Sequence, residues 1–133
     1  MSDSNLMVLS TLEDIKYSLE LILKRFKHIN SSDDFMDNED NLEKLDSIAM
    51  RLVAIGEGFK NIDKLTQKNF LINYESIDWK GVKGIRDVLS HHYFDINAEV
   101  IYDLCDKNLG ELLSVVILMI EDIKSTHSKE KVI

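Results

Sequence analysis

The chain has 133 residues, of which 44% are hydrophobic and 30% charged, a balance typical of a soluble globular domain. We expect one domain over residues 1–133, with frayed ends at 1–9 and 126–133. The net charge of −8 argues against non-specific binding of nucleic acid through a broad basic surface, although it leaves a small local site possible. Because Cys105 is the only cysteine, an intramolecular disulfide and a multi-cysteine zinc site are excluded, and a reduced, cytoplasmic location is favoured.

The chain offers no candidate for a membrane span. Its longest strongly apolar run, Leu112–Ile120, has nine residues, whereas a transmembrane helix needs about 20. The first residues lack a basic region followed by an apolar stretch, so they do not resemble a signal peptide. We therefore expect a soluble protein that has no membrane partner.

Helical spacing of apolar residues begins early in the chain. Ser10–Glu13 has the spacing of a capping box, so we expect the first helix to begin there and to end near His28. The polar, acidic segment Asn30–Asp40 follows. It could be an acidic docking loop, but a solvated connection that caps the next helix is the interpretation we favour.

A second long helix is expected from Asn38 to Asn61, with a broad apolar face. Gly56 and Gly58 lie inside it. Each glycine costs up to about 1 kcal/mol relative to alanine in a helix. The pair therefore indicates either close approach by a neighbouring helix or a weak point.

The second half of the chain is also expected to be helical. A short helical piece over Leu65–Asn73 precedes a third major helix, which Asp78 caps and which ends in the motif "IRDVLSHHYFD". A last helical stretch then begins at Asp95 or Asn97. No window alternates apolar and polar residues as a strand does. The sequence thus predicts an all-α, up-and-down bundle of four long helices plus a short one.

The motif "IRDVLSHHYFD" is the main candidate for a reactive site. The imidazole of His91 can exchange a proton with a ribose hydroxyl near neutral pH. The planar guanidinium of Arg86 can hold a phosphate and offset the charge of a transition state. This chemistry requires no metal, and the sequence has neither a cysteine pair nor an H-E-x-x-H motif, so we expect no metal and no cofactor.

Helix geometry sets a condition on this site. Residues five apart on an ideal helix are rotated by roughly 140°, so Arg86 and His91 would not share a face. They could converge if Arg86 reached around the helix, if the helix unwound near His92, or if a two-fold dimer brought two copies into one cleft. The purely structural alternative is favoured by spacing alone. In it Arg86 pairs with a surface carboxylate, both histidines merely end the helix, and Tyr93 packs on the core.

The wider sequence resembles the HepT family of the HEPN superfamily. Three features match in order: I-G-E at Ile55–Glu57, then Trp79 and Gly84, then R-x-x-x-x-H-x-Y at Arg86, His91 and Tyr93. The similarity runs from about Leu42 into the last helix. Many relatives have glycine between the histidine and the tyrosine, where this chain has His92, so either His91 or His92 could face the cleft. The spacing to Tyr93 favours His91.

The resemblance implies a HEPN-like bundle that dimerises and acts as the toxin ribonuclease of a prokaryotic toxin–antitoxin pair. By analogy, Arg86 stabilises the scissile phosphate and His91 is the general acid/base, without metal, with Asp87 and His92 in support. The partner in this family is MntA, a minimal nucleotidyltransferase antitoxin that adds AMP to the motif tyrosine, here Tyr93. The added charge and bulk would block entry of RNA.

A non-enzymatic alternative remains open at this point. The chain could be a helical partner that binds and regulates a nucleotidyltransferase, with Arg86 and His91 serving binding. The net charge of −8 fits this alternative slightly better, whereas the intact motif fits the ribonuclease better. A plain dimeric bundle would leave the polar cluster unexplained. His28 and His127 are assigned no function, and Cys105 is expected on the apolar face of the last helix.

Overall fold

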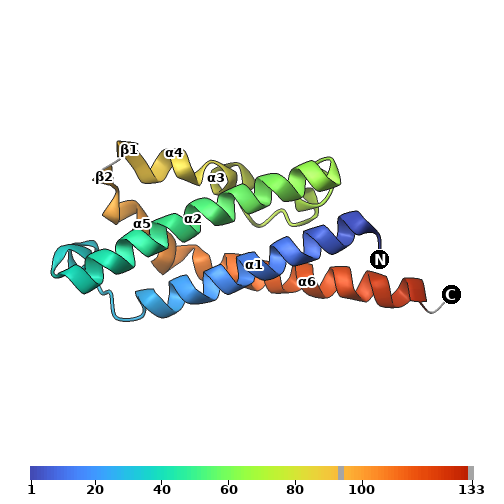
Figure 1. Cartoon of the computed structure of the whole chain (residues 1–133), viewed down its shortest axis with the longest axis horizontal. Coiled ribbons are helices and arrows are strands. Elements are labelled where there is room, and N and C mark those ends of the chain that lie inside the picture. The colour runs from blue at the N-terminus through green and yellow to red at the C-terminus, as the bar shows by residue number, and fades with distance from the viewer. Residues whose placement is uncertain (93–94, 132–133) are drawn as a thin grey trace.

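The described part of the chain is built from α-helices with one small β-ladder. The computed structural model describes the backbone of residues 1–92 and 95–131 and the side chains of residues 1–89 and 96–126. Figure 1 labels its helices and strands. In chain order the elements are α1 (Asp3–Phe26), the 3-10 helix η1 (Ser32–Met36), α2 (Glu39–Thr66), the 3-10 helix η2 (Leu71–Asn73), α3 (Trp79–Lys83), α4 (Ile85–Leu89), β1 (Ser90–His92), β2 (Asp95–Ile96), α5 (Ala98–Lys107) and α6 (Leu109–Lys131).

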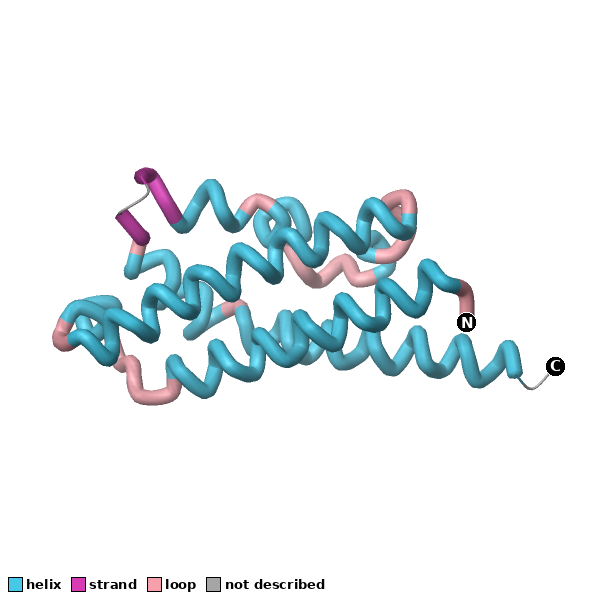
Figure 2. The backbone as a smooth tube through the Cα atoms, viewed as in Figure 1, coloured by secondary structure: helices cyan, strands magenta, loops and turns pink. Residues whose placement is uncertain are grey.

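The helices α1, α2 and α6 run side by side along the molecule. α1 packs against both α2 and α6, and the two chain ends lie at the same end of the bundle (Figure 1). The short segment α3–α4 lies against α2 and leads to the β-ladder at the other end (Figure 2). This arrangement confirms the predicted all-α bundle.

One apolar core fills the space between the long helices. Its members recur every three or four residues, so each helix turns one stripe inward. Burying each large apolar side chain contributes about 1.5–3 kcal/mol. The largest fully buried side chains are Phe35, Phe59, Leu12, Leu19, Ile22, Leu45, Ile48, Leu52, Ile62, Ile101, Met119 and Val8.

α1 begins eight residues earlier than the sequence predicts. Its N-cap is Ser2, whose Oγ accepts a hydrogen bond from the Asn5 N–H at 3.1 Å. Ser10 lies inside the helix, so the predicted capping box is wrong. The physical reason is that Val8, 1% exposed, extends the buried stripe toward the N-terminus and makes helix there favourable.

α2 begins as predicted and ends later. Asn38 caps it by accepting a hydrogen bond from the Asn41 N–H at 2.8 Å, but the helix continues to Thr66 instead of ending near Asn61. Gln67 and Lys68 then adopt φ values of 55° and 63°. Such left-handed backbone costs about 1–3 kcal/mol per non-glycine residue. The last turn of α2 and η2 therefore replace the helical piece expected over 65–73.

The third major helix predicted from Asp78 is broken twice. Asp78 does cap a helix, since its Oδ1 accepts a hydrogen bond from the Gly81 N–H at 3.1 Å. Gly84 then separates α3 from α4, and α4 ends at Leu89. The strands β1 and β2 pair antiparallel, with Ser90 opposite Ile96. The prediction that the chain has no strand is thus wrong, because strands of two and three residues are too short to show an alternating pattern.

The final helical stretch is also divided. Of the two candidate caps, Asp95 and Asn97, it is Asn97 that caps α5, by accepting a hydrogen bond from the Val100 N–H at 3.2 Å. α5 ends at Lys107 with Asn108 as its C-cap, and α6 begins at the next residue. The division lets α5 turn toward η1 while α6 returns along α1.

Both glycines of α2 mark close approaches between elements. A Cβ on Gly56 would lie 2.9 Å from the Val82 carbonyl oxygen and 3.0 Å from Cγ2 of Ile85. A Cβ on Gly58 would lie 3.0 Å from Cδ1 of Ile15 on α1. The close-approach interpretation is therefore confirmed, and Gly56 sets the distance between α2 and the α3–α4 segment.

We predict that Gly56→Ala destabilises the protein. The new methyl group must push the Val82 carbonyl away from α2, so we expect a loss of about 1–2 kcal/mol in the free energy of unfolding despite the better helix propensity of alanine. The matched control is Gly110→Ala in α6, where nothing lies within 4 Å, and it should be neutral or stabilise by up to about 1 kcal/mol. Urea unfolding measures both. Equal stabilities of the two variants would contradict the prediction.

Candidate active site

The platform of the candidate site is the α3–α4 segment, and Trp79 anchors its first residue. The indole Nε1–H donates a hydrogen bond to the Tyr74 carbonyl at 2.9 Å. The indole ring packs against the ring of Phe59, with centroids 4.8 Å apart. Because Phe59 is fully buried in α2, these contacts fix the start of α3 to the core.

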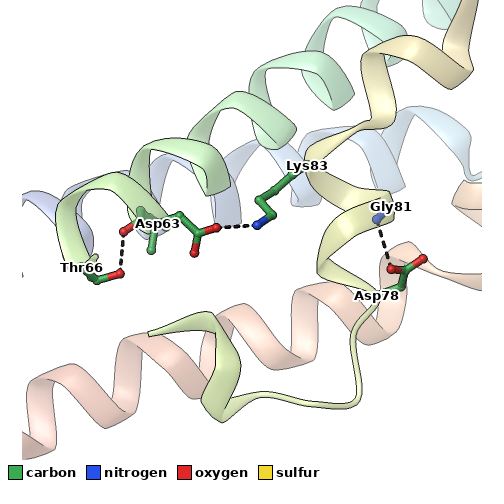
Figure 3. A network of polar contacts seen from close by, with 6 residues as sticks. Asp63, Thr66, Asp78, Gly81 and Lys83 are labelled. Atoms are coloured by element: carbon green, nitrogen blue, oxygen red, sulfur yellow. Dashed lines mark hydrogen bonds and ion pairs between the residues drawn. The ribbon is translucent and has the colours of Figure 1, made fainter. Parts of the chain in front are cut away.

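An ion pair fixes the other end of α3. Lys83 Nζ contacts Oδ2 of Asp63 near the C-terminal end of α2 (Figure 3). The side chain of Asp63 is 11% exposed and that of Lys83 is 29% exposed, so water screens this pair less than a surface pair. Sequence reasoning missed Asp63. The sequence does contain a feature that could have identified Asp63. It is a carboxylate one residue after the buried Ile62, at a position where the apolar stripe of α2 continues.

Arg86 and Asp87 lie in the first turn of α4, and both are exposed. Arg86 follows Ile85, the residue that packs on Gly56. The purely structural alternative expects Arg86 to pair with a surface carboxylate. No carboxylate among the described side chains forms an ion pair with it. A guanidinium on a fixed, solvent-facing turn is suited to bind a phosphate.

The histidines lie beyond the end of the helix. α4 stops at Leu89, so His91 and His92 belong to β1 and the 140° separation calculated for a continuous helix does not apply. The ladder pairs His92 with Asp95, and the Asn97 N–H donates to the Leu89 carbonyl at 2.9 Å. The side chains of both histidines, and the whole of Tyr93, lie outside the described residues.

The three segments that carry the sequence motif thus form one structural unit. Ile55 and Gly56 of α2 contribute the surface on which α3 and α4 rest. Gly84 makes the break between those two helices, and its N–H donates to the Lys80 carbonyl at 3.0 Å. The motif therefore describes a local three-dimensional arrangement that presents Arg86 from a rigid base.

An apolar cavity of about 360 Å³ lies beneath the platform, between α2, α3–α4 and α5–α6. It is walled chiefly by aliphatic side chains such as Leu52, Ile85, Val88 and Leu104. No group of three or more His, Cys, Asp or Glu side chains that could hold a metal occurs among the described residues. No helix in the described part of the chain is long and apolar enough to cross a membrane.

Among the described residues, the half-buried Tyr74 and the buried Cys105 have shifted pKa values. Burial, followed by the hydrogen bond to Asp122 (2.7 Å) and its negative charge, raises the pKa of the Tyr74 hydroxyl. This bond ties the segment before α3 to α6. Burial also raises the pKa of the Cys105 thiol to about 12. Cys105 is 5% exposed on the apolar face of α5, so the expected apolar environment is confirmed, on the first helix of the divided final stretch.

Comparison with known proteins identifies the family. The sequence pattern of the family described as "Ribonuclease HepT-like" matches residues 15–119. The chain belongs to the HepT-like family. The resemblance inferred from the motif is thereby confirmed, and the matched range contains Arg86, His91, His92 and Tyr93.

Individual relatives agree with this membership in the HepT-like family. The chain is 31% identical over 115 residues to "Putative RNase MJ0127" of Methanocaldococcus jannaschii, covering 84% of this chain and 92% of that protein. It is 33% identical over 101 residues to "Putative RNase TTE0752" of Caldanaerobacter subterraneus subsp. tengcongensis, covering 76% and 83%. No solved structure matches the chain.

We predict that the Cys105 thiol of this HepT-like protein is unreactive while the chain is folded. A rise of the pKa from 9.0 to about 12 leaves about 10³-fold less thiolate at pH 8, and burial further blocks reagents. A chromogenic disulfide reagent should therefore label the folded chain slowly and the urea-unfolded chain at once. Because the folded pKa is raised, the stabilising contribution of Cys105 is complete below pH 9 and declines between pH 9 and about 12. Fast labelling at pH 8 of the folded chain would contradict the prediction.

Proposed function

We propose that this protein is a metal-independent endoribonuclease whose catalytic residues are Arg86 and His91. Membership in the HepT-like ribonuclease family is the observation that carries this proposal. The placement of Arg86 supports it, because this cation is exposed, faces no carboxylate partner among the described side chains, and stands on a segment fixed by Gly56, Trp79 and Lys83.

The proposed reaction is transfer within the RNA chain. His91 accepts the proton of a ribose 2′-hydroxyl, and the 2′-oxygen forms a bond to the adjacent phosphorus. The bond from phosphorus to the 5′-oxygen breaks, and that oxygen leaves with a proton from an acid, for which His92 is the candidate. Arg86 offsets the extra negative charge on the phosphoryl oxygens, and Asp87 supports its placement.

We further propose that the protein is the toxin of a toxin–antitoxin pair. An MntA-like nucleotidyltransferase would neutralise it by adding AMP to Tyr93, two residues from His91. An adenylyl group brings a phosphate charge and a bulky base to the place where RNA must enter. Like charges would then repel the substrate from Arg86.

We propose that the active form is a homodimer assembled across α4. Val88, two residues after Arg86, is 49% exposed although it is aliphatic, and it borders the apolar cavity beneath the platform. A second copy packed on this face would cover Val88 and would bring two copies of the motif into one cleft.

One observation favours a second candidate function. With a net charge of −8, the chain as a whole repels RNA, which fits a non-catalytic partner that binds and regulates a nucleotidyltransferase. In that case Arg86 and His91 would contribute to a protein interface, and no RNA would be cleaved.

We predict that purified wild-type protein cleaves single-stranded RNA in the presence of EDTA. His91→Ala should lower kcat by about 10²- to 10⁴-fold, because it removes a general acid/base, and Arg86→Ala should lower kcat/KM because it removes phosphate stabilisation. Gel analysis of end-labelled RNA measures the rates. In cells, wild type should arrest growth, and co-expression of an MntA-like nucleotidyltransferase should restore growth.

His92→Ala separates the roles of the two histidines, since it removes the candidate general acid from the same strand β1. A smaller decrease in kcat than that of His91→Ala supports the assignment of His91 as the general base, whereas the opposite order would move that role to His92. Unchanged melting temperatures should accompany each loss of activity. If the wild-type protein is folded but neither cleaves RNA nor arrests growth, the result contradicts the ribonuclease proposal. It then supports the second candidate function, a non-catalytic partner of a nucleotidyltransferase.

We predict that light scattering at micromolar concentration gives a mass of twice 15.4 kDa. Val88→Glu should reduce it to 15.4 kDa, because a charge buried in an apolar contact is costly. The control is Leu118→Glu on α6, where a leucine is 47% exposed, and it should remain a dimer. A monomeric wild type would exclude the dimer, and dissociation caused only by Leu118→Glu would move the interface to α6.

A further inference from the structure

A hollow lined by lysines lies at the C-terminal end of α2. Its volume is about 640 Å³, and α2, the turn that follows it and α3 contribute its walls. The lining residues are Lys60, Asp63, Lys64, Gln67, Lys68 and Lys83. Four of the chain's 16 basic residues thus gather around one carboxylate, in a protein whose net charge is −8.

The charges of the hollow are only partly neutralised. Asp63 pairs with Lys83, and Lys60 pairs at 3.3 Å with Glu57, which lies three residues earlier on α2. Lys64 and Lys68 make no ion pair with any carboxylate whose side chain is described. Both are exposed, so their ammonium groups are available to an anion from solution.

The local backbone places these cations in a row. Lys60 and Lys64 are one turn apart on α2, which is about 6 Å along the helix axis. Lys68 follows in the left-handed turn, with a φ of 63°, and its N–H donates to the Asp63 carbonyl at 2.8 Å. This strained turn thus brings a third cation back to the helix that carries the other two.

The row leads to the candidate active site. Lys83 lies in the hollow and is three residues before Arg86, so their Cα atoms are at most about 11 Å apart. Its ion pair with Asp63 connects the hollow to α3, on the platform that presents Arg86 (Figure 3). An extended polyanion that lies in the hollow can therefore continue toward Arg86.

We propose that this hollow binds the phosphate backbone of the RNA substrate, on one side of the scissile phosphate, through Lys64 and Lys68, with Lys60 and Lys83 in support. This inference rests on the proposed ribonuclease function. Charge complementarity favours a polyanion, because single-stranded nucleic acid is bound by positively charged grooves that follow its backbone. A protein partner fits less well, since the cores of protein interfaces are depleted in lysine and none of the described side chains that line the hollow is aliphatic or aromatic.

The test compares Lys64→Gln/Lys68→Gln with a control that removes the same charge elsewhere. The control is Lys24→Gln/Lys107→Gln, two exposed lysines on α1 and α5. RNA affinity is measured by fluorescence anisotropy in a His91→Ala background at several salt concentrations. The hollow variant should bind about fivefold more weakly, and the slope of log K against log salt should fall by about 1.4, since each phosphate contact on a single strand contributes about 0.7. With an intact His91, KM should rise and kcat should remain within about twofold.

The outcomes separate this inference from the proposed function. If wild type cleaves RNA and the two double variants have equal affinities and salt slopes, the hollow is not an RNA site although the ribonuclease stands. If RNA binding is unchanged and the hollow variant alone fails to bind an MntA-like nucleotidyltransferase, the hollow binds protein and the inference is wrong. If wild type neither binds nor cleaves RNA, the proposed function fails and this inference fails with it.

Discussion

The close approach of the α3–α4 backbone to Gly56 is the constraint on which the candidate site depends. The Val82 carbonyl lies where a side chain on α2 would be, so any residue larger than glycine changes the distance between the two layers. Trp79 and Lys83 hold the same segment at two further points, one through the core and one through Asp63. With three contacts over five residues of helix, α3 has little freedom to shift along α2. Arg86 shares that rigidity because it follows Ile85, which packs on Gly56, and a fixed cation loses less entropy on binding a phosphate.

Net charge is a poor guide to such a molecule. Much of the acidic excess lies in segments that cap or connect helices, such as 33–40, where carboxylates favour the positive ends of helix dipoles. The lysines at the end of α2 are equally well placed beside the negative end of that dipole. Helix electrostatics therefore separates the two signs of charge between the two ends of α2. A chain with a net charge of −8 can in this way keep a basic hollow. The acidic groups on its surface lie within about a Debye length of that hollow, so the attraction of the hollow for a polyanion depends on the salt concentration.

Local chemistry made part of the fold predictable. Asn38, Asp78 and Asn97 each begin a helix where expected, because a side-chain oxygen needs only the next three residues to make its cap. Helix ends that depend on tertiary contacts were predicted wrongly. Val8 extends α1 because α1 has neighbours to pack against, and Gln67 ends α2 in a conformation usually given to glycine. Likewise, no periodic pattern reveals that the helical segment after Asp78 stops at Leu89. It stops there because the backbone of the next residue, Ser90, pairs with Ile96 in the β-ladder instead of continuing the helix.

The sequence names candidate members of the site but does not predict its shape. Arg86 and His91 stay predictions from the motif, and the assumption of a continuous helix separated them by geometry that the chain does not adopt. Ending α4 at Leu89 removes that separation and gives the backbone after it a ladder partner in β2. The proposed modification of Tyr93 would act close to the same position in the chain. Two residues of chain span at most about 7 Å, so the Cα atoms of Tyr93 and His91 cannot lie farther apart than that. In the proposed mechanism inhibition therefore needs no conformational signal through the bundle, because the added bulk and charge are attached two residues from the proposed general acid/base.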